Sequence, residues 1–195
     1  MSARIGYAAR DDRLAVRGHA LILGVVLFLA SELMFFAAWF AAYFALRGRT
    51  AQWPPPDVHL DPVEPSIGTV VLGASSLLVL LAVRAIHQDR ANAARRWLLG
   101  AVGCGIVFLA LTIHDWSKNT FTIATHAYGS LHYGITGFHA AHVLAGVIML
   151  SLLAAGARRP GFTGANAAGA EAISYYWHFV FVVWLAIWLM VYFVK

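Results

Sequence analysis

The sequence predicts an all-α polytopic membrane protein with five transmembrane helices in a bundle. Of the 195 residues, 61% are hydrophobic and 12% are charged, whereas a soluble domain carries about 25% charged residues. The apolar residues gather in five runs, each long enough for the roughly 20 residues that a spanning helix needs. The runs lack the alternation of barrel strands, and a helix satisfies its own backbone groups in lipid. An ordinary water-soluble enzyme is therefore excluded.

The first two predicted helices span about residues 20–46 and 66–86. Residues 1–18 carry six charges and form a polar tail. The apolar run that follows is longer than the core of a signal peptide, so it stays in the membrane. We therefore divide the chain into a tail, 1–18, and a membrane domain, 19–195. Between the two helices, Trp53 precedes three prolines, which predict an extended surface loop because proline cannot continue a helix.

The remaining predicted helices span about residues 97–116, 130–157 and 172–194. The first of them ends at His114 and Asp115, for which an interfacial cap is the simplest interpretation. The Gly- and Ala-rich loop 158–171 is expected to be mobile. The aromatic residues of the last helix predict a face toward lipid or toward the membrane interface: Trp177, Trp184, Trp188 and Tyr192.

Small residues recur every four positions at Gly137, Ala141 and Ala145, and again at Ala101 and Gly105. This spacing lets helices approach one another closely. It predicts tight packing within the bundle or, alternatively, a docking face for another subunit.

The distribution of cations predicts the orientation in the membrane. With five crossings, ten arginines lie on one side and four cations on the other. The side with more cations is cytoplasmic, so the N-terminus is expected inside and the C-terminus outside. The ten are Arg4, Arg10, Arg13, Arg17, Arg84, Arg90, Arg95, Arg96, Arg158 and Arg159, and the four are Arg47, Arg49, Lys118 and Lys195.

Glu32 is a charged residue near the centre of the first predicted helix. An ionised carboxylate at that depth costs about 3 kcal/mol, so we expect Glu32 to face the bundle and to be protonated or paired. Two interpretations stay open. The carboxyl is part of a proton path or is coupled to redox chemistry, or it is an internal hydrogen-bonded link between helices.

Three histidines are the candidate polar partners of Glu32. His139 and His142 are three residues apart, share a face of the fourth helix and lie roughly level with Glu32, while His178 lies near the start of the fifth helix. The simplest interpretation is polar contact between helices, including a Glu32–histidine contact. The alternatives are a metal site that combines both histidines with the carboxylate and a haem held by His139 and His178.

Basic and aromatic residues near the helix ends are candidates for contact with lipid head groups: Arg84, His87, Arg95, Arg96, Trp39 and Trp177. Basic groups at this level bind anionic or zwitterionic head groups, or they serve as plain topology anchors.

The sequence contains no nucleophile–base pair, no phosphate-binding glycine loop and no two-thiolate copper site. Cys104 is the single cysteine, which excludes an intrachain disulfide, a cage of several thiolates and covalent c-type haem. We therefore predict no catalytic centre and no metal site. The net charge of +5 does not indicate nucleic acid, because the cations lie in loops beside apolar spans.

Five stretches carry a further signal: S-E-L-M-F-F at 31–36, W-P-P-P-D-V-H at 53–59, F-T-I with Y-G-S within 121–130, T-G-F-H-A-A-H-V at 136–143 and Y-W-H-F-V-F-V-V-W-L at 176–185. Together, and in this order, they resemble subunit III of haem–copper cytochrome c oxidases over nearly the whole chain from about Gly18. Many members of that family have seven helices, and this chain resembles the short form with five.

The resemblance implies a helix bundle split by a lipid-binding cleft. It implies a non-catalytic subunit that carries no haem or copper, which lie on partner subunits. The chain would flank the catalytic subunit I, and also subunit II, of a proton-pumping aa3-type oxidase that reduces oxygen to water. It would bind structural phospholipids, stabilise the catalytic subunit, and support proton uptake and oxygen access. We expect it in the cytoplasmic membrane of a bacterium.

The sequence departs from the family pattern at three positions. Phe181 stands where the family has an aspartate, and Thr112 and Asp115 stand where it has glutamine and glutamate. Glu32 carries over as the family's buried carboxyl. The resemblance carries His139, His142 and His178 over as motif histidines, to which we assign packing, polar contacts or proximity to lipid rather than metal.

Other classes of protein remain as alternatives. Within the superfamily these are subunit III of a quinol oxidase and the related accessory protein of nitric oxide reduction, and the W-P-P and F-T-I with Y-G-S segments favour the cytochrome c branch. An independent haem-binding protein and a transporter-like bundle are the others. The few acids in the spans and the missing inverted repeats weigh against a transporter.

Overall fold

The computed structural model describes residues 2–158 and 167–194, with side chains from residue 20 onward. It contains five helices: α1 (Ser2–Arg47), α2 (Val63–His87), α3 (Ala91–Lys118), α4 (Ala127–Gly156) and α5 (Ala167–Tyr192). All five are long and apolar enough to cross a membrane, and no strand occurs in the described ranges. The five predicted helices and the all-α membrane class are therefore confirmed.

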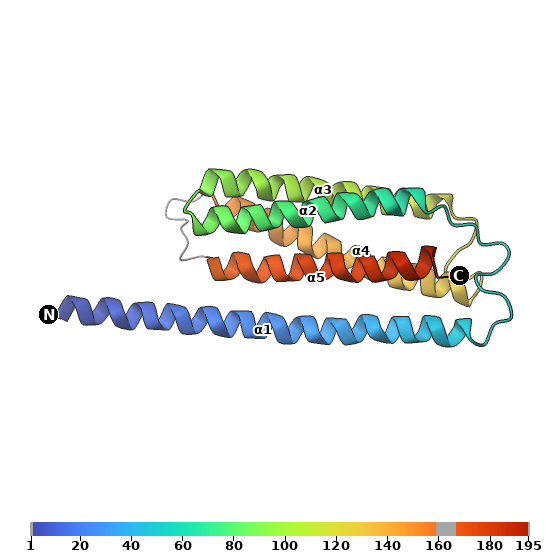
Figure 1. Ribbon diagram of the computed structural model, residues 1–195, viewed down its shortest axis with the longest axis horizontal. Helices are drawn as coiled ribbons and strands as arrows, with labels where there is room; N and C mark the ends of the chain where they lie inside the picture. The colour runs from blue at the N-terminus through green and yellow to red at the C-terminus, as the bar shows by residue number, and fades with distance from the viewer. Residues whose placement is uncertain (1, 159–166, 195) are drawn as a thin grey trace.

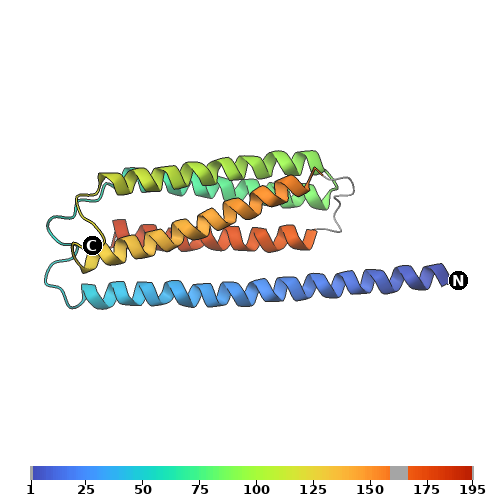
Figure 2. The same ribbon diagram turned by 180° about the vertical axis from the view of Figure 1, so that it is seen from behind.

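The helices run side by side, with α2 to α5 forming the body of the bundle and α1 lying along its edge next to α5 and α4 (Figures 1 and 2). The most extensive packing is between α2 and α3, which a short turn joins. The bundle has two ends: the α2–α3 end, where that turn lies, and the α3–α4 end, where the C-terminus and the loop before α2 also lie (Figure 1).

α1 is longer than the sequence predicted. The helix begins at Ser2 and has 46 residues, which at 1.5 Å per residue is about 69 Å, against roughly 30 Å of membrane hydrocarbon. Its apolar part is Ala20–Arg47, and the segment before it continues as helix past the α2–α3 end of the bundle (Figure 1). The polar tail is thus helical and continuous with the first span.

α5 also begins earlier than predicted. It starts at Ala167, so residues 167–171 belong to the helix and not to the expected mobile loop. Residues 159–166 of that loop, including Arg159, lie outside the described residues.

Tryptophans of α5 face α2, where hydroxyl groups accept their indole N–H groups. The N–H of Trp177 donates to Ser75 Oγ at 2.9 Å, and that of Trp184 donates to Thr69 Oγ1 at 2.8 Å. Trp188 donates to Ser66 Oγ at 3.3 Å. The face toward lipid or the membrane interface that we predicted for these aromatic residues is wrong for Trp177, Trp184 and Tyr192, which are buried, since a polar N–H or O–H away from water needs an acceptor inside the bundle. We call this contact the indole–hydroxyl seam.

Two glycines make room for the indole ring of Trp177. A Cβ atom on Gly146 of α4 would lie 2.5 Å from that ring, and one on Gly105 of α3 would lie 3.0 Å from it. Ala101 and Gly105 are buried, which confirms the packing that their spacing predicted, whereas Ala141 and Ala145 are exposed on α4. Those two alanines do not pack within the described chain.

The loops at the α3–α4 end are tied to the helices. The ring of Trp53 lies 5.2 Å from that of Tyr43 and 5.1 Å from that of Tyr128. His126 caps α4, since its Nδ1 accepts the backbone N–H of Gly129 at 2.8 Å, as N-cap acceptors do. A Cβ atom at position 129 would lie 2.4 Å from the carbonyl oxygen of Thr122, so the first turn of α4 requires glycine at this position.

Candidate functional site

Glu32 of α1 and His142 of α4 form an ion pair or hydrogen bond between helices. Glu32 Oε2 lies 2.9 Å from His142 Nε2, and the two side chains are 21% and 18% exposed. The expected contact between Glu32 and a histidine is confirmed, with His142 as the partner. The carboxyl therefore meets a polar group of α4 at the edge of the bundle, where α1 packs on α4.

The second ring nitrogen of His142 determines which protons this contact holds. His142 Nδ1 lies 2.7 Å from the carbonyl oxygen of Phe138, and because a carbonyl only accepts, Nδ1 carries a proton. Nε2 then either accepts a proton from the neutral carboxylic acid or donates one to the carboxylate. In both cases Glu32 and His142 share one proton and the pair is neutral overall, which suits a site in the membrane.

Aromatic rings enclose the Glu32–His142 pair and connect it to α5. The ring of Phe36 lies 5.2 Å from that of His142, and the ring of Tyr176 stacks at 6.5 Å. The hydroxyl of Tyr176 donates to the carbonyl oxygen of His142 at 3.0 Å. Phe28 of α1 stacks on Tyr176 at 6.4 Å. Together Glu32, His142 and Tyr176 join α1, α4 and α5, and we call them the Glu32 link.

His139 is directed to a different part of the bundle from His142. It is 1% exposed, its ring stacks on Trp184 at 5.1 Å and it meets Phe108 edge-on at 5.7 Å. Neither of its ring nitrogens has a hydrogen-bond partner among the residues that the structure describes. Residues three apart on a helix differ by about 60° in direction, which is enough to place His139 in the core and His142 at the edge.

In the described part of the chain no group of three or more potential metal ligands occurs. His178 is half-buried on α5, and no hydrogen bond or ion pair is recorded between it and Glu32, His139 or His142. Of the four polar residues, Glu32 and His142 therefore contact each other, His139 lies in the core, and His178 lies apart from them.

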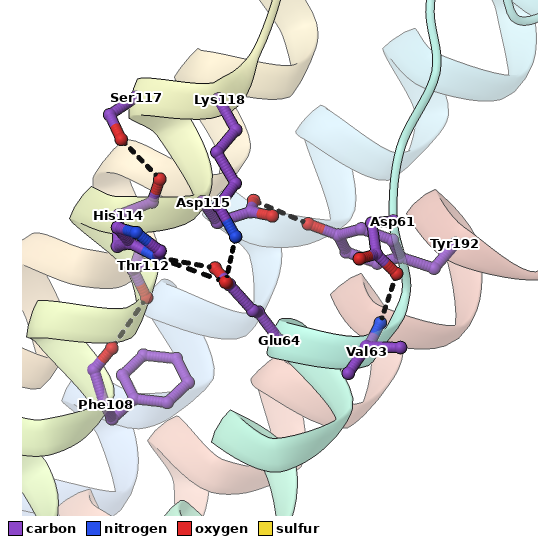
Figure 3. Close-up of polar contacts among 10 residues, drawn as sticks. All are labelled: Asp61, Val63, Glu64, Phe108, Thr112, His114, Asp115, Ser117, Lys118 and Tyr192. Carbon is purple, nitrogen blue, oxygen red and sulfur yellow. Dashed lines mark hydrogen bonds and ion pairs between the residues drawn. The ribbon is translucent and has the colours of Figure 1, made fainter.

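A second polar cluster, at the α3–α4 end, joins α2 to α3 (Figure 3). The carboxylate of Glu64 accepts a hydrogen bond from Lys118 and lies 3.1 Å from His114 Nδ1. Glu64 thus lies between a lysine and a histidine of α3. At the start of α2, Asp61 Oδ1 accepts the backbone N–H of Val63 at 3.0 Å.

Asp115 points from the same turn of α3 into the bundle (Figure 3). It is buried, and its Oδ2 accepts the hydroxyl of Tyr192 at 3.1 Å. We expected His114 and Asp115 to form an interfacial cap. Instead, His114 contacts Glu64 of α2 and Asp115 contacts Tyr192 of α5. No local sequence pattern pairs Asp115 with Tyr192, because the two residues are 77 positions apart.

The basic candidates for lipid contact lie at the α2–α3 end. Arg84 and Arg96 are exposed there, and Arg95 is half-buried. His87 Nε2 lies 2.9 Å from Glu171 Oε1 of α5.

The two tryptophans that we predicted as lipid contacts behave differently. Trp39 is half-buried on α1 and fills the space above Gly134, where a Cβ would lie 2.7 Å from its ring. Trp177 is 1% exposed, so the contact with a lipid head group that we predicted for it is wrong. Its place in the indole–hydroxyl seam is the physical reason.

Phe181, at the position of the family's aspartate, lies between α5 and α2. Its ring would be 3.2 Å from a Cβ at Gly73, and its side chain is half-buried. A phenyl ring at this position packs against a glycine of the neighbouring helix, so an apolar contact stands in the place of a carboxyl.

These features define a class: a polytopic α-helical membrane protein in which buried or half-buried polar side chains, among them Glu32, His142 and Asp115, connect one helix to another. The comparisons narrow this class. The family model for cytochrome c oxidase subunit III matches residues 7–195. The chain therefore belongs to the cytochrome c oxidase subunit III family.

Individual relatives agree with the family match. The chain is 36% identical over 183 residues to a probable cytochrome c oxidase subunit 3 of Mycobacterium tuberculosis, covering 92% of this chain and 90% of the relative. It is 34% identical over 185 residues to the subunit 3 of Corynebacterium diphtheriae, with the same coverage. It is 33% identical over 172 residues to that of Thermostichus vulcanus, covering 88% of this chain and 86% of the relative.

Proposed function

We propose that this chain is the non-catalytic subunit III of a proton-pumping aa3-type cytochrome c oxidase. It flanks the catalytic subunit I and subunit II, which hold the haem and copper. It binds structural phospholipids, stabilises the catalytic subunit, and supports proton uptake and oxygen access. The observation that carries the proposal is the family match over residues 7–195. The distribution of cations supports a cytoplasmic N-terminus and an outer C-terminus in the cytoplasmic membrane of a bacterium.

The Glu32 link supplies the physical mechanism. α1 lies at the edge of the bundle (Figure 1), and its contact with α4 includes the 2.9 Å pair of Glu32 and His142. This pair sets the spacing of the helices that border a wedge of ordered lipid. Oxygen is apolar and concentrates in lipid, so a wedge beside the catalytic subunit feeds the reaction.

The assembly is tested by purifying the tagged chain from its native membrane in mild detergent and recording a reduced-minus-oxidised optical spectrum. Haem bands that co-purify, and that leave when the chain is stripped from larger subunits, are the expected result. Haem that stays with the isolated chain would contradict the proposal, as would a preparation without haem at either stage.

The role of Glu32 is tested in the purified oxidase with Glu32→Gln and Glu32→Ala. We expect unchanged haem content and an altered number of turnovers before inactivation or an altered dependence on oxygen. Glu171→Gln is the matched control, because Glu171 also lies 2.9 Å from a histidine, His87, whose side chain is 50% exposed at the bundle end. Parent behaviour in both Glu32 variants would show that the proposed role is wrong.

A further inference from the structure

Four polar side chains follow one another on the buried face of α4, in the half of the helix next to the α3–α4 end. They are Tyr128, His132, Thr136 and His139, and each is 2% exposed or less. Because successive members are three or four residues apart, they share one face of the helix. From Tyr128 to His139 the helix rises about 16 Å, roughly half of the membrane hydrocarbon. We call these four residues the α4 polar file.

Most polar atoms of the α4 polar file have no partner within the described chain. The hydroxyl of Tyr128 and both ring nitrogens of His132 and of His139 are buried and form no hydrogen bond with described residues. A buried polar group without a partner costs free energy, and native proteins satisfy nearly all such groups with protein or with ordered water. These atoms therefore need hydrogen-bond partners from outside the chain.

The aromatic rings around the two histidines meet only part of this need. His139 meets Phe108 edge-on at 5.7 Å, and His132 meets Phe121 at 5.5 Å. The face of such a ring receives an N–H group weakly. A neutral imidazole also has one nitrogen that only accepts, and a phenyl ring has no N–H or O–H to donate to it. A water molecule both donates and accepts, so it suits both nitrogens.

A narrow cavity lies beside the α4 polar file. Among its lining residues, Glu64 is half-buried at the α3–α4 end of the bundle, whereas Phe108, Thr136 and Trp184 are buried. The rings of Phe108 and Trp184 also contact His139, so the cavity leads from the bundle end toward that histidine. Its volume is about 10 Å³, which is room for about one water molecule.

The polar lining of this cavity favours water over an anion. The carboxyl groups of Glu64 and Asp115 belong to the lining. The hydroxyls of Thr112 and Thr136, which also line it, donate to carbonyl groups of their own helices at 3.0 and 2.6 Å. Their oxygens are therefore left as acceptors. Acceptors of this kind bind the hydrogens of water, and the carboxylates repel anions.

We propose that the α4 polar file binds internal water molecules, which exchange with the α3–α4 end through the cavity at Asp115. These water molecules bond the ring nitrogens of His132 and His139 and the hydroxyl of Tyr128. Beyond His139 the buried residues of α4 are apolar: Val143, Gly146, Val147, Leu150 and Ala154. The hydrated part therefore ends near the middle of the membrane and forms a half-channel instead of a pore. In the orientation proposed above, it opens to the outer side.

X-ray radiolytic footprinting of the full chain in its native membrane, in water enriched in a heavy oxygen isotope, tests this proposal. Bound water forms hydroxyl radicals on irradiation, and mass spectrometry locates the side chains that they oxidise. We expect His132 and His139 to be labelled several-fold faster than Trp177. Trp177 is as buried as His139 and more reactive toward the radical, but its N–H already donates to Ser75 and it packs on the apolar half of α4 at Gly146.

Thr136→Val removes a polar group of the cavity without changing the shape of the side chain. We expect a several-fold loss of labelling at His139. The matched control is Ser151→Ala, because the Ser151 hydroxyl also donates to a carbonyl four residues earlier on α4, at 2.7 Å, but lies in the other half of the helix.

Gly68→Ala fills part of the cavity and should also slow the labelling of His139. The new Cβ would lie 3.3 Å from the ring of Phe108. The control, Gly73→Ala, is on the same helix and places a Cβ 3.2 Å from the ring of Phe181, which does not line the cavity.

The other outcomes would overturn the proposal. Histidines labelled as slowly as Trp177 would mean that the α4 polar file is dry and that its N–H groups rest on ring faces. Histidines and Trp177 labelled equally fast would mean that water crosses the whole bundle. Equal effects of each variant and its control would mean that water reaches His139 by another route. These results do not depend on oxidase activity, so they leave the proposed function untouched.

Discussion

α5 and α1 both have an apolar segment long enough to cross the membrane, but they are held in the bundle differently. In the most apolar window of each helix, 44% of the residues of α5 are buried and 6% of those of α1. Three indole N–H groups of α5 donate to hydroxyls of α2. α1 is bonded to other helices by the Glu32–His142 contact at 2.9 Å and by a long bond from Tyr43 to Met190 at 3.5 Å.

We therefore expect the polar bonds of α5 to contribute to stability and the Glu32 link to contribute to function. The polar bonds of α5 lie inside a packed core, so their loss is expected to destabilise the fold. The Glu32 link lies at the edge of α1, which keeps most of its apolar surface open to lipid or to partner subunits. Its loss is expected to change the position of α1 while the other four helices stay folded.

Trp177→Ala should give the largest effect on the α5 side of this comparison. The ring is 1% exposed, and removing a buried aromatic side chain costs about 3–5 kcal/mol. The free energy of unfolding, measured by SDS titration in mixed micelles, should fall by that amount. Trp188→Ala is the control and should cost less, because Trp188 is half-buried. Equal losses would contradict a core role for Trp177.

Gly146→Val should destabilise the bundle by about 1–3 kcal/mol, the usual cost of overpacking. The new side chain would begin 2.5 Å from the ring of Trp177. Gly156→Val on the same helix meets no atom within 4 Å at its Cβ and should be nearly neutral. The comparison is made by thermal unfolding in mild detergent. A neutral Gly146→Val would mean that Trp177 and α4 are not in close contact.

Ser75→Ala should cost about 1 kcal/mol, because it leaves the buried N–H of Trp177 without its acceptor. Ser151→Ala is the matched control, since the Ser151 hydroxyl donates to the carbonyl of Val147 on its own helix. SDS titration of both variants measures the difference. If the two serine variants were equally stable, the indole–hydroxyl seam would contribute nothing.

Glu32→Gln should have the smallest effect on stability, below about 1 kcal/mol, because hydrogen bonds between membrane helices average about 0.6 kcal/mol. The amide of glutamine still reaches His142 as a hydrogen-bonding group. The same SDS titration checks this. A loss as large as that of Trp177→Ala would place Glu32 among the residues that hold the core.

The five spans could be predicted from the sequence because hydropathy is a property of each segment by itself. Which way a side chain points is set by the neighbouring helix, and the sequence does not contain that directly. Trp177 was expected near lipid because aromatic residues gather at membrane interfaces, but the hydroxyl of Ser75 and the missing side chains of Gly105 and Gly146 provide a place for it inside.

The candidate site was predicted in part for the same reason. A carboxyl in the membrane must find a partner, so a Glu32–histidine contact follows from the cost of burial. The choice of His142 over His139 depends on the rotation of α4 and on where α1 packs, and both come from tertiary contacts. The bond between Asp115 and Tyr192 joins residues 77 positions apart, which no local pattern indicates.

The most direct test of the central claim is a double-mutant cycle on the Glu32 link in the purified oxidase. Glu32→Ala, His142→Ala and the double variant are compared by the number of turnovers before inactivation, at equal haem content. If Glu32 and His142 act together to position α1, each single variant inactivates earlier and the double variant is no worse than the more affected single one. Parent-like turnover in the single variants, or additive losses in the double variant, would contradict the account.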